Sequence, residues 1–130
     1  MIPRPADPLV AALDVSTLAE AERLAALLSP HVGMLKVGLE LAWGVGPEAV
    51  RRISAHGPVF VDCKLHDIPT TVERASANVA SLGVAMLNVH ALGGETMMRA
   101  ARSGAERGAS AAGVDPPTNT AAATSSSPVP

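Results

Sequence analysis

Four ionisable side chains stand close together near the middle of the chain, in the stretch VFVDCKLHDIPTTV at residues 59–72. They are Asp62, Lys64, His66 and Asp67. The stretch begins as an apolar run, which is typical of a buried strand, and ends at a proline suited to the first position of a helix. Charged groups near a core cost free energy unless they are paired. The sequence therefore predicts that acidic and basic side chains at this position hold one another in an ionic network.

Three further apolar runs also turn polar toward their ends. These runs are LVAALD at 9–14, MLKVGL at 34–39 and AMLNVH at 85–90. Side chains alternate between the two faces of a strand, so each run has one apolar face and one face that becomes polar. The second face carries Asp14, Lys36, Asp62 and Lys64. We expect these four side chains to form one ionic network.

Helical patterns separate the four runs. They are STLAEAERLAALLSP, in which Thr17 and Glu20 have capping-box spacing, PEAVRRISAHG, PTTVERASANVASLG, and residues from Glu95 to about Arg107. Strands that alternate with helices predict an α/β fold with a parallel sheet and right-handed crossovers. In such folds ligands bind where the strands end, at the edge that would carry the charged residues.

Composition excludes several classes of function. The chain has 130 residues, a formal net charge of −2 and 48% hydrophobic residues, which does not indicate a nucleic-acid partner. No apolar run is long enough to cross a membrane, and the first residues lack the apolar core of a secretory signal. Cys63 is the single cysteine, so no intrachain disulfide forms. We expect a cytoplasmic protein.

The chain divides into two parts by composition. Residues 1–107 are patterned, whereas 108–130 contain no Leu, Ile, Phe, Lys or Arg and are rich in Ala, Ser, Thr and Pro. Such a segment buries too little apolar surface to offset the entropy of ordering. We therefore predict a domain over 1–107 and a disordered tail over 108–130.

Structural interpretations compete with the functional ones for single residues. Asp14 alone is as consistent with a turn or a helix cap, and Lys36 alone could extend to solvent. His90 is typical of a hydrogen-bonded core histidine, and the histidines are not spaced as metal ligands. Thr70 and Glu73 have the spacing of a capping box. The common pattern of all four strands favours a functional site.

The stretch VDCKLHDIPTTV resembles the signature of the orotidine 5′-phosphate decarboxylase family, an acid-x-Lys-x-x-Asp motif followed by Ile-Pro-x-Thr. LVAALDV, MLKVGLEL and NVHALGGETMM resemble its first, second and fourth strands, so that the resemblance covers about Pro8 to Arg102. It implies the first four βα units of a (β/α)8 barrel. It also implies a homodimer that converts orotidine 5′-phosphate to UMP and CO2 in pyrimidine biosynthesis, without a cofactor or a metal.

The resemblance also implies roles for individual residues. Lys64 would donate a proton to C6 of the pyrimidine, next to Asp62, which would lie against the departing carboxylate. Lys36 and Asp14 would contact the ribose hydroxyls and order the charges. The remaining substrate contacts would come from a segment that includes Asp67, Ile68 and Thr71, with Asp67 and Thr71 reaching into the site of the partner subunit.

The resemblance ends after four of the eight expected units. The later strands and the phosphate-binding loops are missing, so we expect a truncated chain that is inactive by itself. The tail is open to three explanations: a frameshift, a natural truncation or a fusion. Two alternatives to the decarboxylase stay open, a non-catalytic half-barrel that self-associates and a sugar-phosphate lyase or synthase of the same superfamily.

Overall fold

The computed structural model describes residues 7–117. Within it the chain forms two compact units, one up to Asp62 and the other from Cys63 onward. The boundary falls inside strand β3 (Val59–Leu65), which therefore contributes residues to both units. Most of the predicted tail, residues 118–130, lies outside the described residues.

The first unit alternates strands and helices. It contains β1 (Val10–Ala12), α1 (Leu18–Leu28), a 3-10 turn (Ser29–His31), β2 (Met34–Val37), α2 (Leu39–Val45), α3 (Pro47–Ser54) and the beginning of β3. The strands are parallel, with Val10 paired with Met34 in one ladder and Leu35 paired with Val59 in the next. The predicted parallel sheet is therefore confirmed in this unit.

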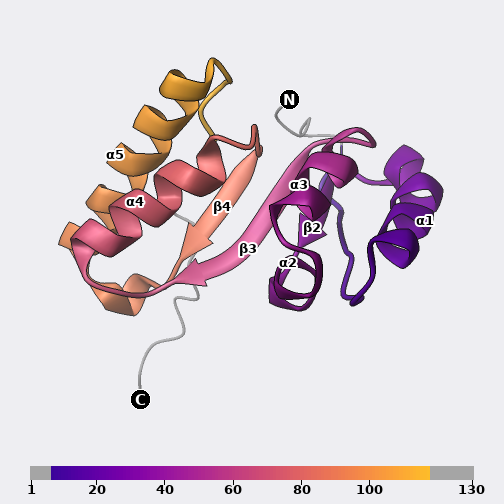
Figure 1. Ribbon diagram of the computed structural model, residues 1–130, viewed down its shortest axis with the longest axis horizontal. Helices are drawn as coiled ribbons and strands as arrows, with labels where there is room; N and C mark the ends of the chain where they lie inside the picture. Colours follow the sequence, from indigo (N-terminus) through magenta and orange to yellow (C-terminus); the bar gives the residue numbers. More distant parts are fainter. Residues whose placement is uncertain (1–6, 118–130) are drawn as a thin grey trace. The chain divides into compact units, whose positions relative to one another are not determined.

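The second unit continues the alternation. It contains the end of β3, α4 (Pro69–Ala80), β4 (Met86–Val89), a 3-10 turn (Ala91–Gly93) and α5 (Glu95–Ala112). Helices α4 and α5 lie side by side next to β4 (Figure 1). The four strands are hydrogen-bonded in the order β1-β2-β3-β4, which is also their order in the sequence.

The two faces of the strands differ in burial as the alternation predicts. On the apolar face, Leu13, Leu35, Val37 and Val59 are buried, and helical residues such as Ile53 complete the core of the first unit. On the opposite face, Val10 and Ala12 are exposed and Lys36 and Phe60 are half-buried. Met34 departs from this pattern because it is buried on the second face. The helices thus cover one face of the strands, and the opposite face is partly exposed, most of all along β1.

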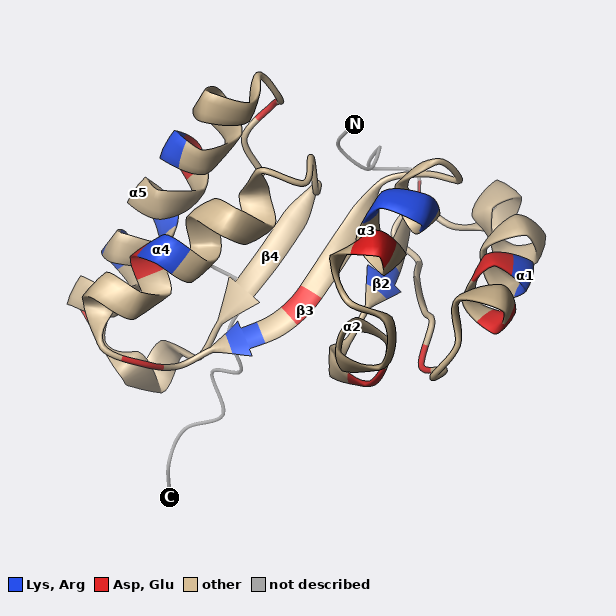
Figure 2. Cartoon of the chain, viewed as in Figure 1, with Lys and Arg blue, Asp and Glu red and all other residues tan. Residues whose placement is uncertain are grey.

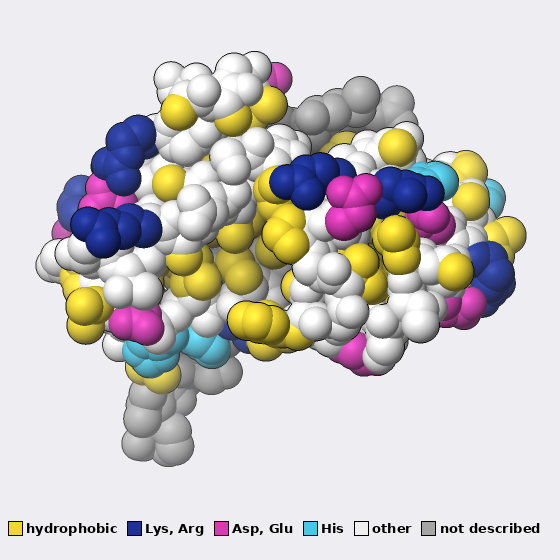
Figure 3. All heavy atoms as spheres, viewed as in Figure 1, with side chains coloured by type: hydrophobic (Ala, Val, Ile, Leu, Met, Phe, Trp, Pro, Cys, Tyr) yellow, Lys and Arg dark blue, Asp and Glu magenta, His cyan; other side chains and the backbone are white. Residues whose placement is uncertain are grey.

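Glycines allow α4 and α5 to pack closely. A Cβ atom added at Gly104 would overlap the carbonyl oxygen of Glu73, and one added at Gly108 would overlap the carbonyl oxygen of Ala77. An ion pair of 2.6 Å between Arg107 and Glu73 also links the two helices. Figure 3 shows arginine and acidic side chains next to one another over this helix pair.

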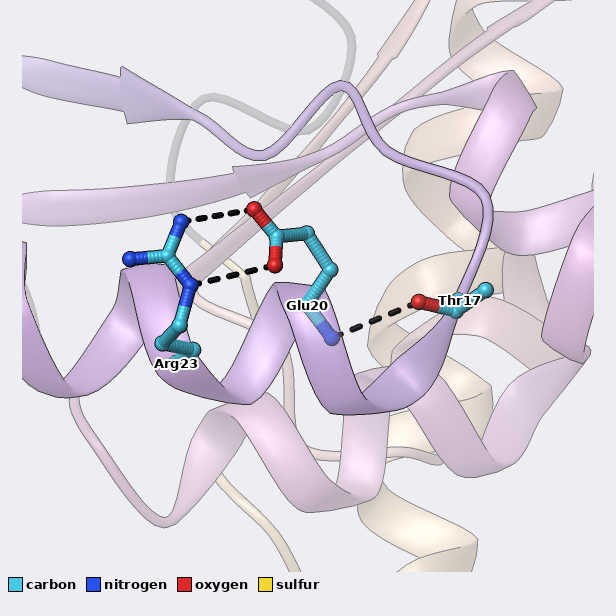
Figure 4. A network of polar contacts seen from close by, with 3 residues as sticks. All are labelled: Thr17, Glu20 and Arg23. Atoms are coloured by element: carbon cyan, nitrogen blue, oxygen red, sulfur yellow. Dashed lines mark hydrogen bonds and ion pairs between the residues drawn. The ribbon is translucent and has the colours of Figure 1, made fainter.

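The start of α1 confirms the predicted cap. Thr17 precedes the helix, and its Oγ1 accepts a hydrogen bond of 3.3 Å from the main-chain N–H of Glu20 (Figure 4). The Glu20 carboxylate binds both Nε and an Nη atom of Arg23, at 3.0 and 2.6 Å. The hydrogen bond from Arg23 lowers the pKa of Glu20, and the same bond raises the pKa of Arg23.

Three details of the sequence-based prediction are wrong. Strand β2 ends at Val37, and residues 39–45, of which Leu39 was assigned to the strand, form the unpredicted helix α2. Helix α5 continues to Ala112 instead of ending about Arg107, because Gly108 and Ala109 are buried against α4. The capping box of Thr70 and Glu73 does not form: the residue that precedes α4 is Ile68, without a side-chain cap.

Candidate active site

An ion pair joins two neighbouring strands, β2 and β3, in the first unit. Lys36 Nζ of β2 lies 3.0 Å from Asp62 Oδ2 of β3. In the parallel register Lys36 is opposite Phe60, so its side chain reaches two residues further along β3 to meet the acid. Figure 2 shows charged residues within both strands. The structure thus brings together Lys36 and Asp62, as predicted for members of one network.

Both members of this ion pair are shielded from water. The Asp62 side chain is 10% exposed and that of Lys36 is 23% exposed. A carboxylate at this depth depends on its partner, because an unpaired charge in a low-dielectric environment is costly. Lys36 therefore does not extend to solvent, as the structural interpretation of this residue alone would have it.

Asp14 follows β1 and lies beside the end of β2. Its Oδ1 would be 3.5 Å from a Cβ atom placed at Gly38. The residue is exposed, and α1 is capped by Thr17, so Asp14 is not a helix cap. Next to it, Ser16 Oγ donates a hydrogen bond of 2.7 Å to Glu40 Oε2 of α2. The ends of β1 and β2 thus carry accessible oxygen atoms.

Lys64, the candidate proton donor, has an unusual main-chain conformation in the second unit. Its φ angle is +48°, and it is the only non-glycine with positive φ among residues 7–117. For a residue with a Cβ atom this left-handed conformation costs roughly 1–2 kcal/mol. Such strain persists where the surroundings impose it, and it is found at functional sites more often than elsewhere.

Asn88 of β4 contacts the strained residue directly. Its side-chain Oδ1 accepts a hydrogen bond of 2.8 Å from the main-chain N–H of Lys64. The alternation of side chains along AMLNVH at 85–90 puts Asn88 on the face that turns polar, without indicating a role for it. The available signal was a polar amide between Leu87 and Val89, which are both buried.

An open hollow of about 630 Å³ lies where β3 and β4 end in the second unit. Its lining residues come from the segments that follow the two strands: His66, Asp67, Ile68, Pro69, Leu92 and Gly93. The Asp67 carboxylate accepts a hydrogen bond of 2.7 Å from the Ile68 N–H, which fixes the entry into α4. Ile68 is 66% exposed, and Thr71 in the first turn of the helix is also exposed.

Two histidines lie near this hollow. The rings of His66 and His90 are 5.5 Å apart and inclined by 45°. The main-chain N–H of His90 donates to the carbonyl of Leu65 at 2.9 Å, and the residue is half-buried. Across residues 7–117, no three His, Cys, Asp or Glu side chains are grouped as metal ligands. No helix of the same part is long and apolar enough to cross a membrane.

The predicted site residues thus fall into two groups along the chain. Asp14, Lys36 and Asp62 belong to the first unit, where Lys36 and Asp62 are paired. Lys64, Asp67, Ile68 and Thr71 belong to the second unit, where Asp67 and Ile68 line the hollow. Asp62 and Lys64 are two residues apart in β3, so a single strand carries the acid and the lysine.

Comparison with known proteins gives one consistent family. A model of the orotidine 5'-phosphate decarboxylase / HUMPS family matches residues 7–126. The orotidine 5'-phosphate decarboxylase of Anaeromyxobacter dehalogenans is 53% identical over 106 residues, which are 81% of this chain and 47% of that protein. That of Halorhodospira halophila is 54% identical over 94 residues, 72% of this chain and 40% of the relative.

Solved structures agree with the sequence comparison. The orotidine 5'-phosphate decarboxylase of Lactobacillus acidophilus, at 35% identity, matches 78% of this chain and 46% of its own with a TM-score of 0.69. The enzyme of Methanocaldococcus jannaschii, complexed with the inhibitor BMP, matches 82% of this chain and 49% of its own, with 27% identity and a TM-score of 0.72. The chain therefore spans about half the length of these relatives. The predicted fold class is confirmed: the four βα units correspond to part of a barrel of this kind.

Proposed function

The chain belongs to the orotidine 5'-phosphate decarboxylase / HUMPS family, and from this membership we propose that it supplies the catalytic lysine of an orotidine 5'-phosphate decarboxylase. The reaction would convert orotidine 5'-phosphate to UMP and CO2. The observation that supports this most is the shielded ion pair between Lys36 and Asp62. Asp62 stands two residues before Lys64 in the same strand. The pair thus fixes the position of a carboxylate that is close in the chain to the proposed proton donor.

The proposed chemistry needs one acid and one oriented carboxylate. As the bond between C6 and the carboxyl carbon breaks, its electron pair stays on C6 and CO2 leaves. The Lys64 ammonium stabilises the developing charge and then gives its proton to C6, so no cofactor or metal is required. Asp62 would lie against the departing carboxylate, with Lys36 fixing its position.

Other residues would hold the substrate. Lys36 and Asp14 are proposed to contact the ribose hydroxyls, which is consistent with their place at the ends of β2 and β1. Asp67, Ile68 and Thr71 are proposed to contact substrate, with Asp67 and Thr71 acting in the site of the partner subunit of a homodimer. Their exposure on or near the hollow leaves them available for this role. We expect the enzyme to be cytoplasmic and to bind neither nucleic acid nor membranes.

A sugar-phosphate lyase or synthase is the second candidate, since the matching family model covers both classes. The curated relatives named above favour the decarboxylase, because each carries that name. The sequence IPTT at 68–71 also favours a nucleotide substrate through its resemblance to the decarboxylase signature. A third candidate, a non-catalytic half-barrel that self-associates, would keep the ion pair without turnover.

A chimaeric enzyme tests the proposal. Residues 1–107 would replace the matching half of the Anaeromyxobacter dehalogenans relative, and the loss of orotidine 5'-phosphate absorbance would be followed. We expect turnover in the chimaera and none after Lys64→Ala. Arg74→Ala, which removes an exposed cation from α4, is the control and should leave turnover unchanged. Turnover that survives Lys64→Ala contradicts the role of Lys64.

A binding titration distinguishes the two enzymatic candidates. The same chimaera would be titrated with UMP and with a hexulose phosphate. Tighter binding of UMP supports the decarboxylase, and tighter binding of the sugar phosphate supports the second candidate. Binding of neither ligand, together with no turnover, would favour the non-catalytic half-barrel.

A further inference from the structure

We propose that Asn88 is a positioning residue for Lys64. Its side-chain carbonyl would hold the Lys64 main chain in the left-handed conformation and thereby fix the direction in which the ε-ammonium is presented. The conformational part of this inference stands by itself, whereas the catalytic part rests on the function proposed above.

The conformation of Lys64 does not come from its own preferences. In the described part of the chain, every other residue with positive φ is a glycine, at positions 46, 83, 94 and 113. Glycine adopts positive φ because it lacks a Cβ atom, and Asn and Asp tolerate it through their short polar side chains. Lysine has a Cβ atom and a long side chain, so neither reason applies to it. The surroundings of Lys64 must therefore impose its φ angle.

The residues on both sides of Lys64 contact β4 or the residue that follows it. Before it, Cys63 Sγ lies 3.4 Å from the main-chain oxygen of Asn88 and donates to it. After it, the carbonyl of Leu65 accepts from the His90 N–H at 2.9 Å. Between these two contacts, the Lys64 N–H donates to the Asn88 side chain. A side-chain acceptor thus binds the main chain at the residue where the strand is distorted.

Asn88 is well fixed for this task. It lies within β4 between Leu87 and Val89, whose side chains are 0% and 1% exposed. Because neighbouring side chains in a strand point to opposite faces, burial of these two on the helix side directs Asn88 to the other side. The amide offers an acceptor for the N–H group, whereas an apolar side chain of similar size would leave that donor without this bond.

The φ angle decides where the lysine side chain points. Relaxation from +48° to the value of a parallel strand, about −120°, would rotate the Cα–Cβ bond far from its present direction. Proton transfer depends on holding the donor within about 3 Å of the acceptor atom, so a redirected ammonium would lose rate before it lost substrate affinity. We therefore expect Asn88 to affect kcat more than KM.

A double-mutant cycle in the 130-residue chain tests the conformational part. Glycine tolerates positive φ and alanine does not, so Lys64→Gly should have an unfolding equilibrium constant about three- to tenfold smaller than Lys64→Ala. In the Asn88→Leu background this advantage of glycine should disappear, because the main chain is free to relax. Asn88→Asp, which keeps the acceptor oxygen, should preserve it. Asn78→Leu, at an exposed position of α4, is the matched control and should also preserve it.

Urea unfolding gives these equilibrium constants, and Asn88→Ala replaces Asn88→Leu if the latter does not fold. The three-bond coupling between the amide and α protons of Lys64 reports φ directly and should change in Asn88→Leu but not in Asn88→Asp. An equal advantage of glycine in the wild-type and Asn88→Leu backgrounds would overturn the proposal.

Turnover of the chimaera tests the catalytic part. Asn88→Leu should lower kcat by about tenfold or more and change KM by less than about threefold, and Asn88→Asp should recover most of kcat. An unchanged kcat in Asn88→Leu would overturn the positioning role. If the unsubstituted chimaera shows no turnover, the proposed function fails, while the double-mutant cycle still decides whether Asn88 holds Lys64.

Discussion

Gly104 of α5 rests against the main-chain carbonyl of Glu73 in α4, with no room between them for a methyl group. The same arrangement recurs one turn later between Gly108 and Ala77. Close contact of this kind lets the two helices bury their small side chains against each other, among them Ala101, Ala105 and Ala109.

The glycine contact predicts a stability effect of unusual sign. In an exposed helix, Gly→Ala stabilises by about 1 kcal/mol. At Gly104 we expect Gly104→Ala to destabilise by about 1–3 kcal/mol, because the new methyl group forces the helices apart. Urea unfolding measures the change, and Ser103→Ala at the exposed neighbouring position is the control. A stabilised Gly104→Ala chain would contradict the close packing.

The Lys36–Asp62 ion pair predicts an asymmetry between single and double substitutions. Lys36→Met removes the ammonium group that lies 3.0 Å from the shielded Asp62 carboxylate and should destabilise the fold by about 1–3 kcal/mol. Adding Asp62→Leu to Lys36→Met removes that carboxylate charge and should restore part of the lost stability. The free energies of unfolding of the two single variants and the double variant form a cycle. Additive effects would mean that the two side chains do not depend on each other.

The contact between Glu20 and Arg23 predicts a pH dependence. Because the folded-state pKa of Glu20 is lowered by its bond to Arg23, ionised Glu20 stabilises the fold at neutral pH. This contribution should be lost as the pH falls through that lowered pKa, below the usual value of 4.5. We therefore expect the stability difference between the wild-type chain and Glu20→Gln to shrink on acidification. A stability difference between the two chains that grows as the pH falls would contradict the lowered pKa of Glu20.

The accessible face of the strands predicts association of the 130-residue polypeptide. In the strand order β1 and β4 are the ends, and an edge strand offers main-chain groups for pairing. Phe60 and Met86 on the accessible face are only half-buried and add apolar surface. We expect dimers or larger species in sedimentation and no decarboxylase activity. Val10→Lys on the exposed part of β1 should reduce the association. A monomer that melts cooperatively, or turnover abolished by Lys64→Ala, would contradict this expectation.

The pattern of the sequence was sufficient for most elements. The strand expected at the beginning of VFVDCKLHDIPTTV is present as β3, and the expected starts of α3 at Pro47 and α4 at Pro69 agree with the structure, because apolar runs and prolines act locally. Helix α2 was missed because its seven residues, LELAWGV, contain a glycine and have no side-chain cap. The end of α5 was missed because the burial of Gly108 depends on α4, which composition does not reveal.

The candidate site was predictable in its residues and less so in its contacts. Alternation along the strands placed Lys36 and Asp62 on one face, and the parallel register then brought them to 3.0 Å. The conformation of Lys64 was not predictable, since a lysine gives no local signal for positive φ. It depends on Asn88, which is 24 residues away in the sequence.

The strained main chain at Lys64 also has a genetic consequence. A lysine codon cannot become a glycine codon by a single-base change, but it can become an asparagine codon in this way. Asparagine is the non-glycine residue that adopts the left-handed region with least difficulty. Random mutagenesis followed by selection for thermal tolerance alone should therefore enrich Lys64→Asn, and each such clone would have exchanged the ammonium group for stability.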